Sequence, residues 1–160
     1  MVPFAATGTL QYAFTPEQHA DAMIIAAIDA AHRQVLMQAY SLSHRRIADA
    51  LVRARIRGVE VAVIADQEQS RANTAIMRDV MRAGIPLLID AHHAAAHNKI
   101  IVIDSGLADC AVITGSFNFT YAAQHRNAEN VLVLGGNVPL CEAYFNNWRR
   151  HRAHALPKLR

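Results

Sequence analysis

Short apolar runs alternate with amphipathic helical segments along the chain, and this alternation limits the possible folds more than any other feature. The runs at 35–40 and 59–65 have the length of strands, and the second is apolar enough to be buried on both faces. Segments 20–31, 47–54 and 76–83 instead place apolar residues at helical spacing. We therefore predict an α/β fold in which a mixed β-sheet is flanked by helices on both faces.

The rest of the chain continues the same pattern. Further strands are expected at 9–14, 85–90, 99–104, 111–114 and 130–134. Thr15-Pro16-Glu17 predicts the start of the first helix, because it supplies an N-cap, a proline at the first helical position and an acid in the first turn. A short helix is expected near Thr120 and a final helix from about Pro139. Since no linker, low-complexity tract or repeat interrupts the chain, residues 1–160 are expected to form a single domain.

Residues 97–118 hold the most distinctive chemical pattern. The chain reads His-Asn-Lys-Ile-Ile-Val-Ile-Asp at 97–104 and Gly-Ser-Phe-Asn at 115–118. Because alternate side chains of a strand point to the same face, His97 and Lys99 are expected to point at one spot. A reactive imidazole beside a fixed positive charge suits a phosphate group, whose negative charge the ammonium stabilises. The segment therefore predicts phosphate chemistry.

Asp104, Phe117 and Phe119 lie in or beside the same stretch, and each has a structural and a functional interpretation. Asp104 lies an odd number of residues from His97, so an unbroken strand would direct it to the opposite face. A structural aspartate that holds the strand end is the favoured interpretation, and a part in the chemistry is the alternative. Phe117 and Phe119 alternate with the polar residues of their loop and are expected to anchor it in the core rather than to stack on bases.

The chain contains nine histidines, and some of them offer metal-ligand chemistry. His93 and His97 would share a face if they lay on one helix, with Asp90 as a nearby carboxylate. Against a metal, Lys99 would place a cation beside it, and residues 94–96 supply no ligand. We therefore predict neither a metal nor another cofactor. The histidines of helical or terminal stretches have no chemical partner near them in the sequence and are expected to serve the surface or packing: His19, His32, His44, His151 and His154.

Taken together, His-x-Lys, the aspartate five residues later and Gly-Ser-x-Asn resemble the motif of the phospholipase D superfamily. The chain is most similar to the small bacterial endonucleases of that group, which carry one motif per chain. The likeness continues in order through residues 14–17, 38–41, 57–61, 83–86 and 126–130 and so covers nearly the whole chain. The resemblance implies a single phospholipase D-like catalytic domain with an α-β-α sandwich, and a phosphodiesterase that needs no metal ion.

The same resemblance implies a role for each motif residue. His97 would attack phosphorus and form a covalent phosphohistidine. Lys99, Ser116 and Asn118 would hold the non-bridging phosphate oxygens. Glu129 would accept a hydrogen bond from the other ring nitrogen of His97, which fixes its tautomer and raises its basicity. A second, equivalent histidine would protonate the leaving oxygen and later activate water.

One chain supplies only one such motif. The nucleophilic imidazole must be unprotonated while the leaving-group acid is protonated, so a single histidine does not fill both roles at once. A homodimer about a two-fold axis, with both motifs meeting at the interface, supplies the second histidine. Such a site would work by preorganised charge, and we expect its activity to survive chelators.

We expect a non-specific endonuclease that acts on DNA, with RNA as a further substrate, because no element that reads bases is evident. A phospholipase D-type hydrolase of phospholipid head groups is one alternative. A catalytically inactive nucleic-acid-binding protein is another, and the intact His97, Lys99, Asn118 and Glu129 count against it.

Positive charge gathers at the end of a chain whose formal net charge is only +3. The last twelve residues carry five cations: Arg149, Arg150, Arg152, Lys158 and Arg160. These cations would attract a polyanion, or they would offset the negative end of a helix dipole, and the two effects are compatible.

The remaining features concern cysteines and location. Cys110 and Cys141 show no zinc-ligand spacing and are expected to be buried free thiols, since their pairing needs a proximity that sequence does not establish. No apolar run has the length of a membrane span, so no integral membrane association is expected. The first residues lack a secretory signal. The protein is therefore expected to be cytoplasmic, or else a mature periplasmic or secreted form whose export signal was replaced by a start Met.

Overall fold

The computed structural model describes residues 3, 5, 7–72 and 74–158. Its strands are β1 (Thr9–Thr15), β2 (Gln34–Ala39), β3 (Glu60–Asp66), β4 (Leu87–Asp90), β5 (Lys99–Ile103), β6 (Ala111–Gly115), β7 (Glu129–Gly135) and β8 (Leu156–Pro157). Its helices are α1 (Ala20–Asp29), α2 (Arg45–Ile56), α3 (Gln67–Ala72), α4 (Thr74–Arg82), α5 (Tyr121–His125) and α6 (Val138–His154).

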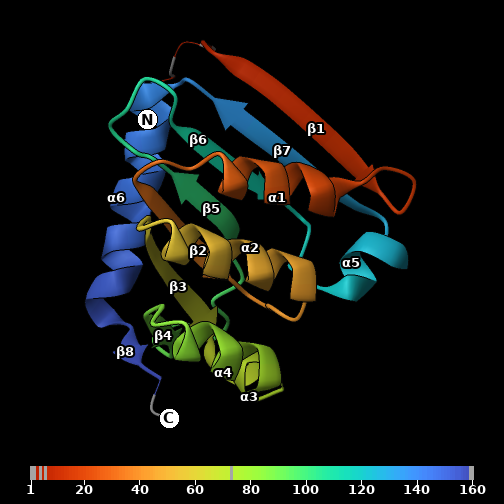
Figure 1. Cartoon of the computed structure of the whole chain (residues 1–160), viewed down its shortest axis with the longest axis vertical. Coiled ribbons are helices and arrows are strands. Elements are labelled where there is room, and N and C mark those ends of the chain that lie inside the picture. The colour runs from red at the N-terminus through yellow and green to blue at the C-terminus, as the bar shows by residue number, and fades with distance from the viewer. Residues whose placement is uncertain (1–2, 4, 6, 73, 159–160) are drawn as a thin grey trace.

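All eight strands of the described chain belong to one sheet, in the order β1-β7-β6-β5-β2-β3-β4-β8 (Figure 1). β2 pairs parallel with β3, and β3 pairs parallel with β4. The other neighbours pair antiparallel. The sheet is therefore mixed, and β5, which carries the motif lysine, lies near its centre.

Helices cover the two faces of the sheet unequally. α1, α2 and α4 bury their apolar residues in the larger core on one face, while α6 packs against a smaller core on the other. Side chains of β5 alternate between these cores, with Ile101 and Ile103 in the larger one and Ile100 and Val102 in the smaller one. This arrangement confirms the predicted α/β fold with a mixed sheet and helices on both faces.

The first helix begins later than its sequence indicates. Thr15 is the last residue of β1, and α1 begins at Ala20. The Thr15 hydroxyl donates to the carbonyl oxygens of Ala123 and Asn127 at 2.7 and 3.0 Å, far from it in the sequence. The predicted N-cap was wrong because a tertiary hydrogen bond holds the hydroxyl.

Cys110 and Cys141 form a disulfide, so the prediction of free thiols was wrong. The pair is fully buried and joins the start of β6 to α6. The two cysteines lie 31 residues apart in sequence and meet because α6 returns across the sheet face that carries β6. Among the described residues, no helix is both long and apolar enough to cross a membrane.

Candidate active site

His97 and Lys99 lie at the point where the chain enters β5. His97 is exposed in the loop before the strand, and Lys99 is the first strand residue, opposite Ala39 of β2. Tyr40 directly follows β2, and its backbone N–H donates to the Asn98 carbonyl oxygen at 2.9 Å, which fixes the residue between His97 and Lys99. The register of β2 against β5 thus fixes where the imidazole and the ammonium stand.

Tyr40 contacts both reactive side chains. Its ring centroid lies 4.4 Å from that of His97 and 4.7 Å from the Lys99 Nζ. The aromatic face attracts the ammonium through a cation–π interaction. His97 and Lys99 were predicted to lie together and do, although His97 stands in the loop before β5 and not on the strand itself. Sequence reasoning gave no role to Tyr40, which contacts both. Its signal in the sequence is its place in segment 38–41, one of those that resemble the superfamily.

Lys99 is a nearly buried cation, with 7% of its surface exposed. Its Nζ donates to the His97 carbonyl oxygen at 2.6 Å. Burial lowers the pKa of Lys99, while the negative charge of Glu129 raises it. The ammonium is thereby fixed beside the imidazole, with little water to screen it.

The loop after β6 lies beside this pair. A Cβ on Gly115 would overlap the Asn130 carbonyl oxygen of β7, so the close approach of the two strands requires glycine there. Ser116 Oγ donates to Glu129 at 2.5 Å and accepts from the Asn130 backbone N–H at 3.1 Å. Asn118 has a buried Oδ1 with no hydrogen-bond partner in the described part of the chain. Because an amide oxygen only accepts hydrogen bonds, a phosphate oxygen would have to be bound by the amide nitrogen of this side chain.

Phe117 and Phe119 confirm the prediction that they anchor this loop. Both are almost completely buried in the larger core. The Phe119 backbone also donates to the Ser41 carbonyl at 3.1 Å and accepts from Ser43 and His44 at 2.9 Å each. The loop is therefore fastened to the segment that follows β2.

Glu129, the first residue of β7, accepts hydrogen bonds from Ser116 and from the Asn127 side chain, the latter at 3.0 Å. A bond from the His97 ring is not among those found in the described residues. The predicted orienting role of Glu129 on His97 stays a prediction. In this structure the carboxylate instead holds Ser116 and adds a negative charge near Lys99.

Asp104 lies at the other end of β5, away from His97. Its buried carboxylate accepts three backbone N–H bonds, from His32 and Arg33 at 2.8 Å each and from Gln34 at 2.6 Å. Its φ of 51° places it in the left-handed region, which aspartate tolerates better than most residues. These contacts favour the structural interpretation, in which Asp104 fastens the start of β2 to the end of β5.

A depression of about 430 Å³ opens over the motif residues. Its lining includes His97, Lys99 and Ser116, together with Thr114 of β6 and Tyr144 of α6. The structure thus brings the predicted nucleophile, cation and serine to one open hollow, with Glu129 bonded to that serine. The arrangement presents an accessible imidazole to an anion bound at a preorganised positive charge.

Comparisons with known proteins agree with this geometry. A family model described as "Cardiolipin synthase, PLD-like domain" matches residues 24–150. The chain belongs to the phospholipase D superfamily. It is 40% identical over 140 residues to a phospholipase D of Rickettsia felis, an alignment that covers 88% of this chain and 68% of the relative. It is also 29% identical over 120 residues to the mitochondrial cardiolipin hydrolase of Xenopus tropicalis, covering 75% of this chain and 55% of that protein.

Solved structures of the superfamily match as well. Nuc from Salmonella typhimurium, a phospholipase D family member, superposes with a TM-score of 0.89 at 33% identity, covering 96% of this chain and 100% of the other. NucT from Helicobacter pylori has a TM-score of 0.80 at 20% identity, a likeness that shows the fold alone. As a member of the phospholipase D superfamily, the chain is a hydrolase that acts on phosphodiester bonds.

Two histidine predictions in this superfamily member were wrong. His151 and His154 do have a chemical partner, since their rings approach the buried Asp90 carboxylate at 2.8 and 3.1 Å. His93 joins them at 3.1 Å. Burial alone would raise the pKa of Asp90, but these hydrogen bonds outweigh it and bring the pKa below its ordinary value. Only the fold brings these residues together.

His44 agrees with its predicted packing role. It is buried, with its Nε2 3.6 Å from the Asp21 carboxylate. Burial lowers the pKa of His44, an effect that the charge of Asp21 opposes.

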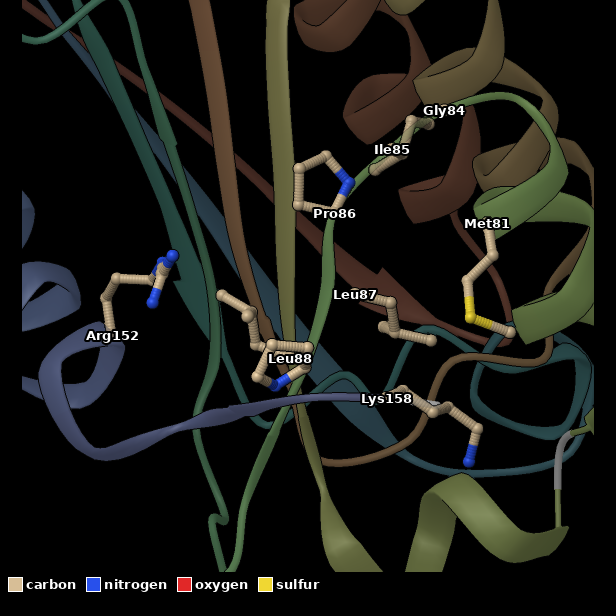
Figure 2. Close-up of a pocket in the computed structure, with 9 residues that line it drawn as sticks. Met81, Gly84, Ile85, Pro86, Leu87, Leu88, Arg152 and Lys158 are labelled. Atoms are coloured by element: carbon tan, nitrogen blue, oxygen red, sulfur yellow. The ribbon is translucent and has the colours of Figure 1, made fainter. Parts of the chain in front are cut away.

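A further hollow of about 370 Å³ lies between β4, α4 and the segment that follows α6 (Figure 2). Its lining is mostly apolar and contains none of the predicted catalytic residues.

Proposed function

We propose that this phospholipase D superfamily member is a metal-independent endonuclease that hydrolyses DNA without sequence preference and also accepts RNA. The observation that carries the proposal is the exposed His97 imidazole beside the buried Lys99 ammonium, both against Tyr40 at an open depression. An open hollow of this kind admits the backbone of a long polymer. The match to Nuc, a phospholipase D family member, covers 96% of this chain and 100% of the other and supports the phosphodiesterase chemistry on which the proposal rests.

The proposed reaction has two steps. A ring nitrogen of His97 attacks phosphorus, the bond to the leaving ester oxygen breaks, and a second histidine gives that oxygen a proton. Water then attacks the phosphohistidine and gives a proton to the second histidine, which regenerates His97 and releases a phosphate monoester. Lys99 and Asn118 stabilise the negative charge on the non-bridging oxygens in both steps. Ser116 supports the pocket through its bonds to Glu129 and Asn130.

The second histidine would come from a second copy of this chain. The sheet face beside the depression carries an uncovered apolar row on the edge strand β1, formed by Leu10, Tyr12 and Phe14, which are 61%, 61% and 55% exposed. The strand register places Tyr12 opposite Leu132 and Leu132 opposite Thr114, which lines the depression. This apolar row is therefore on the same face as the active-site hollow.

A homodimer that buries this row would bring a second motif toward the first. The row is large and apolar for an exposed edge strand, and such strands are normally protected by pairing, charge or cover. The chemistry also requires a second imidazole at the same phosphate, and one chain carries only one copy of the motif. These two observations favour a second copy of this chain as the occupant.

Positive charge on α6 supports binding of a polyanion. Tyr144 of this helix lines the depression, and the exposed Arg149, Arg150 and Arg152 follow on its later turns. Their charges also offset the negative end of the helix dipole. Arg160, the last predicted member of this basic group, lies outside the described residues.

Phospholipid hydrolysis is the second candidate, favoured by the names of the relatives from Rickettsia felis and Xenopus tropicalis. The two candidates share the chemistry and differ in the leaving group. Purified wild type, His97→Ala and the control His19→Ala should be incubated with plasmid DNA, RNA and vesicles of phosphatidylcholine or cardiolipin, all in EDTA. We expect nicking by wild type and by the control only. Head-group release without nicking would establish the lipid reaction, and DNA binding without turnover would contradict both.

The disulfide bears on location. Disulfides persist in oxidising compartments and are rare in the cytosol. We propose that the Cys110–Cys141 bond indicates a periplasmic or secreted protein. Fractionation of the native host should find the chain outside the cytoplasm, and a purely cytosolic chain with reduced cysteines would contradict this.

A further inference from the structure

A second cluster of reactive side chains lies outside the motif, around Asp90. This residue ends β4 and is completely buried. Three imidazole nitrogens surround its Oδ2: His151 Nδ1 at 2.8 Å, His93 Nδ1 at 3.1 Å and His154 Nε2 at 3.1 Å. His93 comes from the loop after β4, and the other two come from the last turn of α6. The four candidate ligand atoms all lie within 4.8 Å of one another.

The donor set of this cluster is one that transition metals prefer. Three imidazoles and one carboxylate converge on a single point, and both group types are common zinc ligands. In the structure the carboxylate is shared by hydrogen bonds: Oδ1 accepts the His92 backbone N–H at 3.0 Å and lies 3.2 Å from the His93 Nδ1, and Oδ2 faces all three rings. An ion at this point would take the place of the ring protons that now join the histidines to Asp90.

The distances suit a small four-coordinate ion. Bonds of about 2.0–2.2 Å from zinc to nitrogen and oxygen place tetrahedral ligand atoms roughly 3.3–3.6 Å apart. The nitrogens lie 2.8, 3.1 and 3.1 Å from Oδ2, and all four candidate ligand atoms lie within 4.8 Å of one another, so small side-chain rotations would bring them to these separations. We propose that Asp90, His93, His151 and His154 form a four-coordinate binding site for a divalent transition-metal ion of the zinc type.

The surroundings of the cluster orient its ligands. His151 and His154 are three residues apart on α6, a spacing that puts both on one helix face. The His92 ring packs against that of His154 with centroids 4.8 Å apart. The His92 backbone N–H donates to Oδ1 of Asp90, so Oδ2 is the oxygen that would face the ion. Side chains of His93 and His154 are 43% and 30% exposed, which provides a path for the ion from solvent.

Such an ion would serve structure rather than the reaction at His97. It would tie the end of α6 to the end of β4 and to the loop 91–98 that leads into the active site. All four positions would be occupied by protein, as in closed structural zinc sites, with no place for a reacting water. The motif chemistry remains independent of the metal.

The test is a metal titration of the full chain, expressed without a histidine tag. Protein stripped with a chelator is titrated with Zn²⁺ by calorimetry, and Co²⁺ is added in parallel to record its visible spectrum. We expect one Zn²⁺ per chain and the intense bands of tetrahedral Co²⁺. His154→Ala should weaken binding by at least about 100-fold, since loss of an outer-shell contact alone typically costs 10–100-fold.

Two further variants keep the result interpretable. His93→Ala alters an exposed loop residue and should weaken binding to the same degree even if His154→Ala folds poorly. His32→Ala removes an exposed histidine outside the cluster and should bind as wild type does. Absence of Zn²⁺ binding by wild type would overturn the proposal, as would equal binding by wild type and both cluster variants. Since binding is measured without any substrate, the result is independent of the proposed nuclease activity.

Discussion

Replacing Asp104 separates a structural role for this motif residue from a chemical one. Its carboxylate accepts backbone N–H groups of three consecutive residues at the start of β2. Of these, Gln34 is buried, whereas His32 and Arg33 are exposed, so water can replace the lost acceptor at two of the three sites. The variant should therefore lose stability mainly through Gln34.

The magnitude follows from these three bonds. We assign about 2–3 kcal/mol to the buried Gln34 bond, which has a charged acceptor, and about 0.5–1 kcal/mol to each exposed one. Asp104→Ala should then lower the free energy of unfolding by about 3–5 kcal/mol. Asp104→Asn keeps one acceptor oxygen and the tolerance for positive φ, and should cost about 1–2 kcal/mol.

Urea unfolding gives the stability, and hydrolysis of bis(p-nitrophenyl) phosphate gives the activity per folded molecule. Asp109→Asn, an exposed carboxylate of the same connection, is the matched control and should change stability by no more than about 0.5 kcal/mol. Asp104→Asn should keep kcat within about threefold of wild type, because a group outside the reaction contributes little to the barrier. A loss of 100-fold in kcat with unchanged unfolding would refute the structural interpretation.

Three further predictions concern other parts of the molecule. Cys141→Ser should lower the free energy of unfolding by roughly 3–4 kcal/mol in urea melts, the loop-entropy value for its sequence separation, and an unchanged midpoint would contradict this. Because burial lowers the pKa of Lys99 and only its protonated form binds phosphate, kcat/KM should fall on the alkaline side below the usual lysine range. Glu129→Gln removes a charge that raises this pKa, so the alkaline limb should move to lower pH, and a shift upward would be contrary to the account. Tyr12→Glu should give monomers by light scattering and lose most activity, while Gln11→Glu on the other side of the same strand should do neither; a fully active monomer would refute the dimer.

Much of the fold follows from local patterns in the chain. The apolar runs of β3 and β5 and the helical spacing of α2 and α4 indicated their elements within a few residues, because burial on one or two faces fixes the period. The prediction that His97 and Lys99 lie together rested on the same period, but β5 begins only at Lys99, and His97 is placed by the loop before it. Phe117 and Phe119 were predictable as anchors because they alternate with polar residues in the loop.

Contacts between distant segments were not predictable from such patterns. The Thr15 hydroxyl has the local sequence of an N-cap but binds carbonyls more than 100 residues away. Cys110 meets Cys141 only because α6 crosses back over β6. The cluster around Asp90 likewise needs the end of α6 beside the end of β4, and no spacing in the sequence records that.

The central claim is that His97 becomes covalently attached to phosphorus during turnover. Wild-type protein should be mixed with DNA labelled with ³²P, denatured within a single turnover, and digested for mass spectrometry and autoradiography. We predict label on the peptide that contains His97, stable to base and lost in acid, and no label on His97→Ala. A chain that hydrolyses DNA with no phosphorus on residue 97, or with undiminished rate in His97→Ala, would contradict the mechanism.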